Sequence, residues 1–222
     1  MASSDGITRA DPGRRYRGLL VDFGGVLTTD VFSSFRSFCQ AEGLLPDTVR
    51  ERFRDDPRGR ELLFGLELGT ISEAEFEPRF ARLLGVERAE GLIDRLFAGM
   101  APDEPMLEAV RAAKRAGVRT GMISNSWGAG GYDRDAFPEL FDGWVISAEE
   151  GVRKPDPRIY TLGAERVGLA PPQCVFVDDL PGNLKPAREL GMATVHHRGA
   201  AETIPALQRL LDVALARPDA RR

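Results

Sequence analysis

Short apolar runs alternate with amphipathic segments along most of the chain. Each run ends in polar residues or glycine, which is typical of a buried parallel strand that leads into a loop. The runs predict five strands, at 17–22, 118–125, 144–147, 174–179 and 193–197. The segments between them predict helices at 105–116, 157–167 and 183–190, each followed by a glycine suited to end it. The alternation predicts an α/β fold with a doubly wound, Rossmann-like parallel sheet.

A long stretch after the first strand breaks this alternation. Residues 31–99 contain no strand-like run, and we interpret them as several amphipathic helices, for example 31–42, 47–54 and 72–84. Ser72 and Glu75 have the spacing of a capping box at the start of the last of these helices. We therefore expect a helical cap insertion at 31–99, and an α/β core that consists of residues 14–30 and 100–215.

The composition is that of an ordinary globular protein, with 42% apolar and 29% charged residues. A net charge of −4 offers no basic field for nucleic acid or for an anionic membrane. No apolar run approaches the ~20 residues that span a bilayer, and Met1–Arg17 lacks the apolar run of a signal sequence. We expect a cytoplasmic protein with a small-molecule partner, no nucleic-acid partner and no membrane contact, and the oligomeric state stays open.

Polar residues gather where the predicted strands end, and ligands bind at that edge of open α/β sheets. The clusters are Asp22-Phe-Gly-Gly-Val-Leu-Thr28, Ser124-Asn125, Lys154-Pro-Asp-Pro157, and Asp178-Asp179 with Asn183. Taken singly, each has a structural interpretation: a turn former, a solvated lysine, or a helix cap such as Asn183 before 184–190. Their joint order favours a functional site, and Lys154 is one of only three lysines in the chain.

These residue types are the ones that phosphoryl transfer needs. A carboxylate such as Asp22 can attack phosphorus. A hard cation held by carboxylates, for example with Asp179, neutralises the phosphate oxygens. A hydroxyl such as that of Ser124, together with a lysine such as Lys154, stabilises the developing charge. The clusters therefore predict a site for phosphoryl transfer.

The four motifs, in this order, resemble those of the haloacid dehalogenase superfamily of phosphohydrolases. The resemblance covers residues 18–200, and the stretch 174–195 is particularly similar to the phosphatase domain at the N-terminus of soluble epoxide hydrolases. The segment 69–76 is similar to one that is common in the caps of such enzymes. The resemblance implies a magnesium-dependent hydrolase that acts on a small phosphorylated metabolite through an aspartyl-phosphate.

The resemblance also implies a set of magnesium ligands. Asp22 would be both the nucleophile and a ligand, and the backbone carbonyl of Gly24 and the carboxylate of Asp179 would complete the protein's share. Asp178 would orient that site, and Asn183 would touch a water bound to the metal.

A second set of residues is implied for the phosphoryl group. Ser124 and the backbone of Asn125 would bind it. Lys154 would balance charge among Asp22, the phosphate and the acidic pair. Each of these residues falls on a matching position of a family motif.

Gly24 departs from the family pattern, in which a second aspartate two residues after the nucleophile acts as general acid and base. That role is worth ~10²–10⁴-fold in rate. Three explanations stay open. Asp30 or Glu67 replaces the missing carboxylate, the substrate has a good leaving group such as an aryl or anomeric phosphate, or catalysis has been lost.

Two other functions compete with a phosphatase. A metal-independent 2-haloacid dehalogenase also uses an aspartate nucleophile and lacks the second aspartate, but gains nothing from the pair Asp178-Asp179. A non-catalytic protein that binds a phosphorylated ligand is the other alternative. Receiver domains use a similar residue set, but their acidic pair follows the first strand, and here it follows the fourth.

Overall fold

Five parallel strands form one sheet with the order β3-β2-β1-β4-β5 in this computed structural model, which describes residues 15–128 and 131–215. The strands are β1 Gly18–Val21, β2 Arg119–Ser124, β3 Gly143–Ile146, β4 Cys174–Asp178 and β5 Ala193–His196. All five strands predicted from the apolar runs are confirmed. β1 is the central strand, β2 and β3 extend the sheet on one side of it, and β4 and β5 extend it on the other. The doubly wound fold class is therefore also confirmed.

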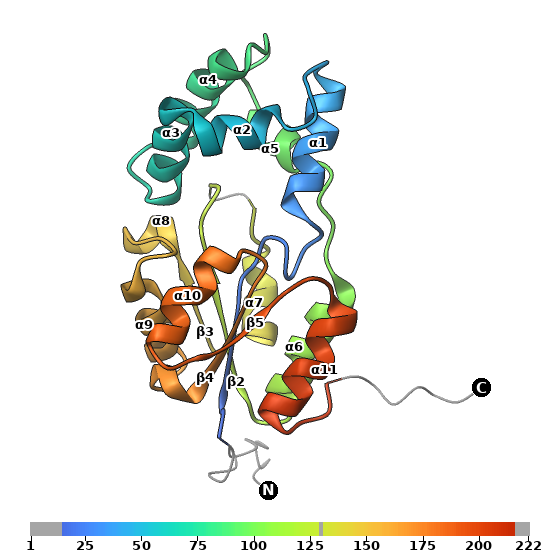
Figure 1. Cartoon of the computed structure of the whole chain (residues 1–222), viewed down its shortest axis with the longest axis vertical. Coiled ribbons are helices and arrows are strands. Elements are labelled where there is room, and N and C mark those ends of the chain that lie inside the picture. Colours follow the sequence, from blue (N-terminus) through green and yellow to red (C-terminus); the bar gives the residue numbers. More distant parts are fainter. Residues whose placement is uncertain (1–14, 129–130, 216–222) are drawn as a thin grey trace, which may run out of the picture.

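Helices cover both faces of this sheet (Figure 1). On one face, α6 (Glu104–Arg115), α7 (Phe137–Leu140) and α11 (Ala200–Leu211) pack against strand residues such as Leu19 and Met122. On the other face, α9 (Pro157–Arg166) and α10 (Pro181–Glu189) pack against Leu20 and Phe176. The short elements are α8 (Ser147–Glu150) after β3 and the 3₁₀ turns η1 (Arg134–Ala136) and η2 (Pro171–Gln173). The core therefore has three layers.

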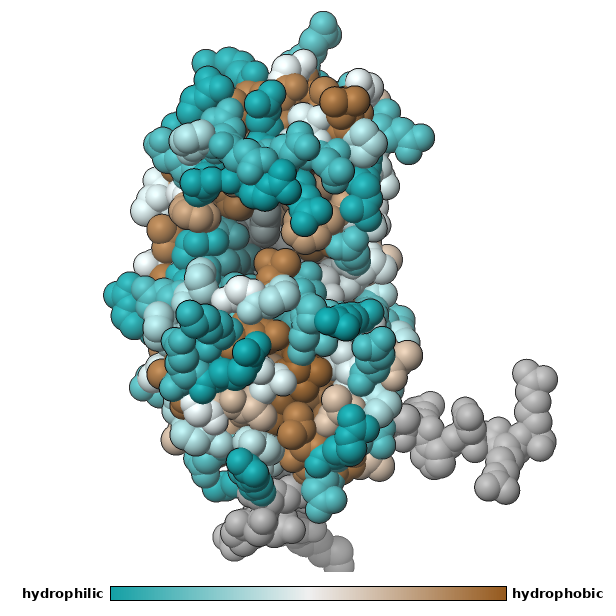
Figure 2. Space-filling model, in the orientation of Figure 1, coloured by the Kyte–Doolittle hydropathy of each residue, from teal (hydrophilic) through white to brown (hydrophobic). Residues whose placement is uncertain are grey.

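Five more helices form a separate layer beyond the carboxyl ends of the strands (Figure 1). They are α1 Val31–Ala41, α2 Thr48–Asp55, α3 Pro57–Glu67, α4 Glu73–Leu84 and α5 Leu92–Phe97. This helical layer has its own buried apolar cluster, which includes Phe35, Leu66 and Phe80. Ser72 caps α4 in the predicted capping box with Glu75. On the face shown in Figure 2, the layer presents mainly hydrophilic residues.

The helical layer is connected to the core through two segments that lie side by side. The amide of Thr29 donates to the carbonyl of Ala101 at 2.8 Å, and the amide of Asp103 donates to the carbonyl of Leu27 at 2.9 Å. Thr28 and Pro102 form an antiparallel bridge between these two bonds. The chain therefore enters and leaves the helical layer at one place.

Two expectations from the sequence concern the ends of the chain and membranes. The loose tails expected at 1–17 and beyond about 215 lie almost entirely outside the described residues. Within the ranges that the structure describes, no helix is both long enough and apolar enough to cross a membrane.

Candidate active site

Asp22 and Asp179 lie next to each other because their strands are neighbours. Val21 of β1 is opposite Val177 of β4, and the amide of Asp22 donates to the carbonyl of Val177 at 2.9 Å. Carboxylate oxygens of Asp22, Asp178 and Asp179 lie within 4.8 Å of one another. The predicted convergence of Asp22 and Asp179 at the carboxyl edge of the sheet is confirmed.

Lys154 reaches into this cluster of carboxylates, as its position in the third motif predicted. Its ammonium lies 2.7 Å from Asp22 Oδ1 and 2.8 Å from Asp178 Oδ2, and its side chain is only 1% exposed. Burial alone lowers the pKa of a lysine, but the two carboxylates outweigh burial and raise the pKa of Lys154. The ammonium therefore stays charged and compensates part of the acidic cluster.

Asn125 fixes the backbone that carries Lys154. The Asn125 side-chain amide donates to the Lys154 carbonyl at 3.2 Å, and its oxygen accepts from the Lys154 amide at 2.8 Å. The Asn125 side chain is therefore occupied by the backbone of Lys154. This contact joins the second motif to the third, and it could not be predicted from the sequence.

Ser124 ends β2 and is buried at the same edge of the sheet. Its hydroxyl lies 2.9 Å from the phenolic oxygen of Tyr132, which belongs to no motif. Tyr132 was missed because it follows a glycine-rich loop with no characteristic spacing. Ser124, Lys154 and Tyr132 all line one cavity with Asp22 and Asp179.

Asn183 contacts Asp178 from inside a helix. Its side-chain amide donates to both carboxylate oxygens of Asp178, at 3.0 and 3.1 Å. The alternative in which Asn183 caps a helix at 184–190 is wrong, because α10 begins three residues earlier, at Pro181, after Leu180. Proline suits the first turn of a helix, where its missing N–H is not needed. Asp178 is thus engaged by Asn183, by Lys154 and by the Leu180 amide at 2.9 Å.

Burial and repulsion from neighbouring carboxylates make Asp22 and Asp179 harder to ionise. The pKa of Asp22 is raised well above its usual value, mainly by burial and also by Asp178 and Asp179, and these effects outweigh Lys154. Burial and the Asp178 charge raise the pKa of Asp179 to about 6. The three carboxylates outnumber the Lys154 ammonium, and this excess of negative charge favours a cation at this point.

Gly24 places no carboxylate beside Asp22, and neither suggested replacement is free. Asp30 accepts hydrogen bonds from the amides of Phe32 and Ser33 as the N-cap of α1. Glu67, at the end of α3, forms an ion pair with Arg153. Burial raises the pKa of Glu67 despite this pairing. Glu67 lines the cavity, whereas Asp30 does not.

The cavity lies between the edge of the sheet and the helical layer and has a volume of about 720 Å³. Its wall away from the carboxylates is largely apolar, with aromatic residues from both layers. Trp127, three residues after Ser124, extends into the helical layer, where its ring centroid lies 5.1 Å from that of Phe97 and 5.3 Å from that of Phe53. The loop after β2 therefore contributes to both the polar and the apolar part of the cavity.

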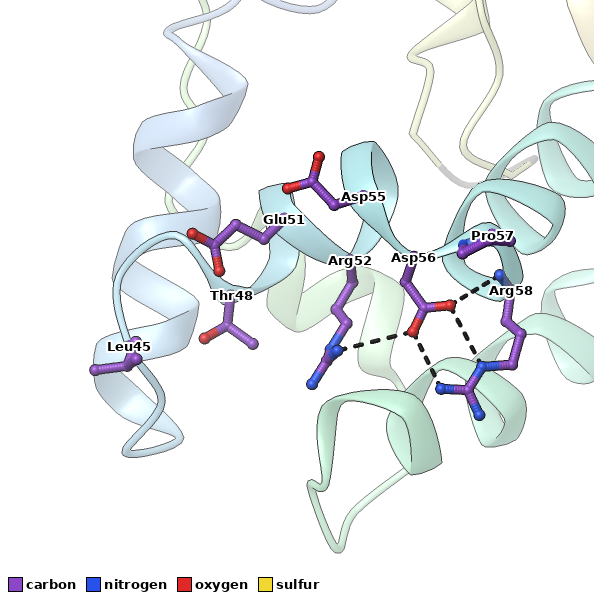
Figure 3. Close-up of a pocket in the computed structure, with 8 residues that line it drawn as sticks. All are labelled: Leu45, Thr48, Glu51, Arg52, Asp55, Asp56, Pro57 and Arg58. Carbon is purple, nitrogen blue, oxygen red and sulfur yellow. Dashed lines mark hydrogen bonds and ion pairs between the residues drawn. The ribbon is translucent and has the colours of Figure 1, made fainter.

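A second hollow, of about 740 Å³, lies along α2 in the helical layer (Figure 3). Three of its charged side chains pair with one another, since Asp56 lies 3.7 Å from Arg52 and 3.1 Å from Arg58. None of the motif residues lines this hollow. We therefore place the site in the cavity at the sheet edge.

Comparisons with known proteins agree with this arrangement of motifs. The family model of haloacid dehalogenase-like hydrolases matches residues 16–191. A protein from Porphyromonas gingivalis, described as a predicted HAD-like family hydrolase, has a solved structure with a TM-score of 0.66 and 26% identity, over 89% of this chain and 98% of its own.

Two curated relatives carry established names. Bifunctional epoxide hydrolase 2 of Mus musculus is 31% identical over 54% of this chain, but the matched part is only 23% of the mouse protein. Hexitol phosphatase A of Escherichia coli is 25% identical over 85% of this chain and 86% of its own length. With its motifs, its fold and a family model that spans most of its length, this chain belongs to the haloacid dehalogenase-like hydrolases.

Proposed function

We propose that the protein is a magnesium-dependent phosphohydrolase that transfers the phosphoryl group of a small phosphate monoester to Asp22. The observation that carries the proposal is the contact of Asp22 with Lys154, 2.7 Å apart, beside Asp178 and Asp179 in the cavity that Ser124 also lines. A nucleophile, a fixed cation, a hydroxyl and surplus carboxylates are the parts that such a transfer requires. Relatives that are named phosphatases support the same class of reaction.

The donor set fits magnesium. The cluster offers carboxylate oxygens, which are hard ligands, and no thiolate or imidazole belongs to it among the described residues. Asp178 is already engaged by Lys154 and Asn183. Asp22 and Asp179, with the Gly24 carbonyl, would therefore hold the ion. When bound, magnesium would neutralise charge on the phosphate oxygens.

The protein's own residues carry out phosphoryl transfer and the hydrolysis of the aspartyl-phosphate that follows. An oxygen of Asp22 attacks phosphorus, the bond from phosphorus to the ester oxygen breaks, and the leaving group departs as an anion, such as a phenolate, that water then protonates. Water then attacks the phosphorus of the aspartyl-phosphate and releases inorganic phosphate, which restores Asp22. The Ser124 hydroxyl, the Asn125 amide and the Lys154 ammonium hold the phosphoryl oxygens during both steps. The helical layer acts as a cap that excludes bulk water from the cavity.

The substrate is an activated ester with an apolar body. Gly24 supplies no proton to the departing oxygen, and Asp30 and Glu67 are engaged by backbone amides and by Arg153. A leaving group of low pKa, such as a phenol, departs without such help. The aromatic wall formed by side chains such as Phe97 and Trp127 suits the same compounds. Turnover of simple alkyl phosphates is expected to be slow.

The test is a screen of phosphate monoesters graded by leaving-group pKa, with magnesium or with a chelator. Hydrolysis that needs magnesium and disappears in Asp22→Asn supports the proposal, and Asp212→Asn, at the exposed end of α11, is a control. Release of halide from a 2-haloacid without metal would establish a dehalogenase instead. Phosphate binding without turnover of any ester would leave a binding protein.

A further inference from the structure

Tyr132 is a polar residue of the cavity to which no motif assigns a role. Its phenolic oxygen lies 2.9 Å from Ser124 Oγ, and its ring is held between two others. The ring centroid of Phe23, the residue after the nucleophile, lies 4.9 Å away, and that of Phe137 lies 6.1 Å away. These ring contacts fix the hydroxyl beside Ser124.

The hydrogen bond between the two hydroxyls can have either direction, and the direction matters. A serine hydroxyl has one hydrogen to donate. If Ser124 donates to Tyr132, it has none left for a phosphoryl oxygen. If Tyr132 donates, the Ser124 hydrogen is free. The other acceptor near Ser124 is the Asn125 carbonyl, at the long distance of 3.4 Å.

Two observations favour Tyr132 as the donor. Burial raises the pKa of Tyr132 to about 12, so the phenol keeps its proton near neutral pH. The Ser124 hydroxyl donates to the Asn125 carbonyl at 3.4 Å, which leaves its oxygen to accept from Tyr132. The Ser124 hydrogen can then turn to a phosphoryl oxygen that binds in the cavity.

We infer that Tyr132 is a positioning residue for phosphoryl transfer, because its hydroxyl donates to Ser124 Oγ and leaves the Ser124 hydrogen to bind a phosphoryl oxygen. The inference rests on the proposed function, and it adds a residue to that site. Tyr132 acts only through Ser124 in this arrangement. Its contribution must therefore vanish when the Ser124 hydroxyl is absent.

A double-mutant cycle on the magnesium-loaded enzyme tests this dependence, with 4-nitrophenyl phosphate as substrate. Tyr132→Phe keeps both ring contacts and removes the hydroxyl, and we expect kcat/KM to fall about tenfold. In the Ser124→Ala background, the same change is expected to alter kcat/KM less than twofold. Tyr16→Phe, in the first segment before β1, is the matched control and is expected to leave kcat/KM unchanged.

The binding of inorganic phosphate, measured by calorimetry, is the second readout. We expect Tyr132→Phe to weaken it severalfold in the wild-type background and not in Ser124→Ala. Full loss from Tyr132→Phe in both backgrounds overturns the inference, as does no loss in either. If no ester is hydrolysed by the wild type, the proposed function fails, and the phosphate cycle alone then decides the inference. Failure to bind phosphate at all overturns both.

Discussion

The Lys154 ammonium lies 2.7 Å from the Asp22 carboxylate, and a side chain that is 1% exposed holds it there. Two buried groups of opposite charge stabilise each other only while both are present. Asp178, at 2.8 Å, depends on the same ammonium. The contact thus links the stability of the core to the chemistry of the site.

We expect Lys154→Met to abolish phosphohydrolase activity and to lower the free energy of unfolding of the metal-free protein by about 3 kcal/mol, because two buried carboxylates lose their cation. Lys154→Arg should also lower kcat at least tenfold, since a planar guanidinium does not fit the place of a compact ammonium. Urea unfolding and kinetics measure both effects. Lys185→Met, with a side chain 78% exposed, is the control, and an equal loss of stability there would contradict the explanation.

The second prediction concerns pH and Asp179. Its folded pKa of about 6 lies above the ordinary value of 3.8, so its ionisation opposes folding. That penalty is absent below pH 4, grows between pH 4 and 6, and is constant above. Asp179→Asn should therefore stabilise the metal-free protein at pH 7.5 by up to about 3 kcal/mol and have little effect at pH 4.

Thermal unfolding across this pH range, with a chelator present, checks that prediction. Magnesium should reverse the order at pH 7.5, because the wild type gains stability by binding the ion and the variant gains less. If the variant is less stable than the wild type without metal, the ionised Asp179 carboxylate does not destabilise the folded protein.

The third prediction restores the carboxylate that Gly24 lacks. The Gly24 backbone lies outside the left-handed region, and an added Cβ meets only Val31 Cγ2, at 3.1 Å, so a side chain fits after a small shift. Gly24→Asp is expected to raise kcat on alkyl phosphates by up to ~10²–10⁴-fold, and on aryl phosphates much less. Gly24→Asn, of the same size but without a carboxyl proton, is the control. Equal rates of alkyl and aryl esters in the wild type would mean that another group already supplies the proton.

The fourth prediction is that a side chain at Gly25, unlike one at Gly24, damages the site. Gly25 has a φ of +74°, and an added Cβ would lie 2.6 Å from Asp179 Oδ2. Gly25→Ala is expected to displace that carboxylate, to weaken magnesium binding ~10–100-fold and to cost about 1 kcal/mol or more in strain. Calorimetric titration with magnesium measures the affinity. Gly24→Ala serves as the comparison, and equal affinities in the two variants would count against Asp179 as a ligand.

The sheet and the motif residues could be predicted because both follow from local patterns. An apolar run that ends in Asp22 or in Asp178 identifies a strand and its polar end without any long-range information. Parallel strands then bring those ends to one edge, which places Asp22 near Asp179. The start of α10 was misjudged because Pro181 can begin a helix as readily as it precedes one.

The contacts between the core and the helical layer could not be predicted. Trp127 packs against Phe53, and Arg153 pairs with Glu67, across long separations in the sequence. Nothing in the local sequence around these residues indicates their partners. Only the docking of the helical layer over the strand ends makes them neighbours. Tyr132 escaped notice for the same reason, since its partner is set by the path of a loop.

The hydrogen bond between Thr29 and Ala101 holds together the two segments through which the chain enters and leaves the helical layer. β1 and β2 are neighbours in the sheet, although the whole helical layer separates them in sequence. A loop of that length normally makes such pairing slow, because its closure entropy is lost before any contact forms. The helical layer has its own apolar cluster and can collapse first, and its ends then meet at the 2.8 Å bond from Thr29 to Ala101. Once the helical layer has formed, only the short segments between it and the two strands must close before β1 pairs with β2.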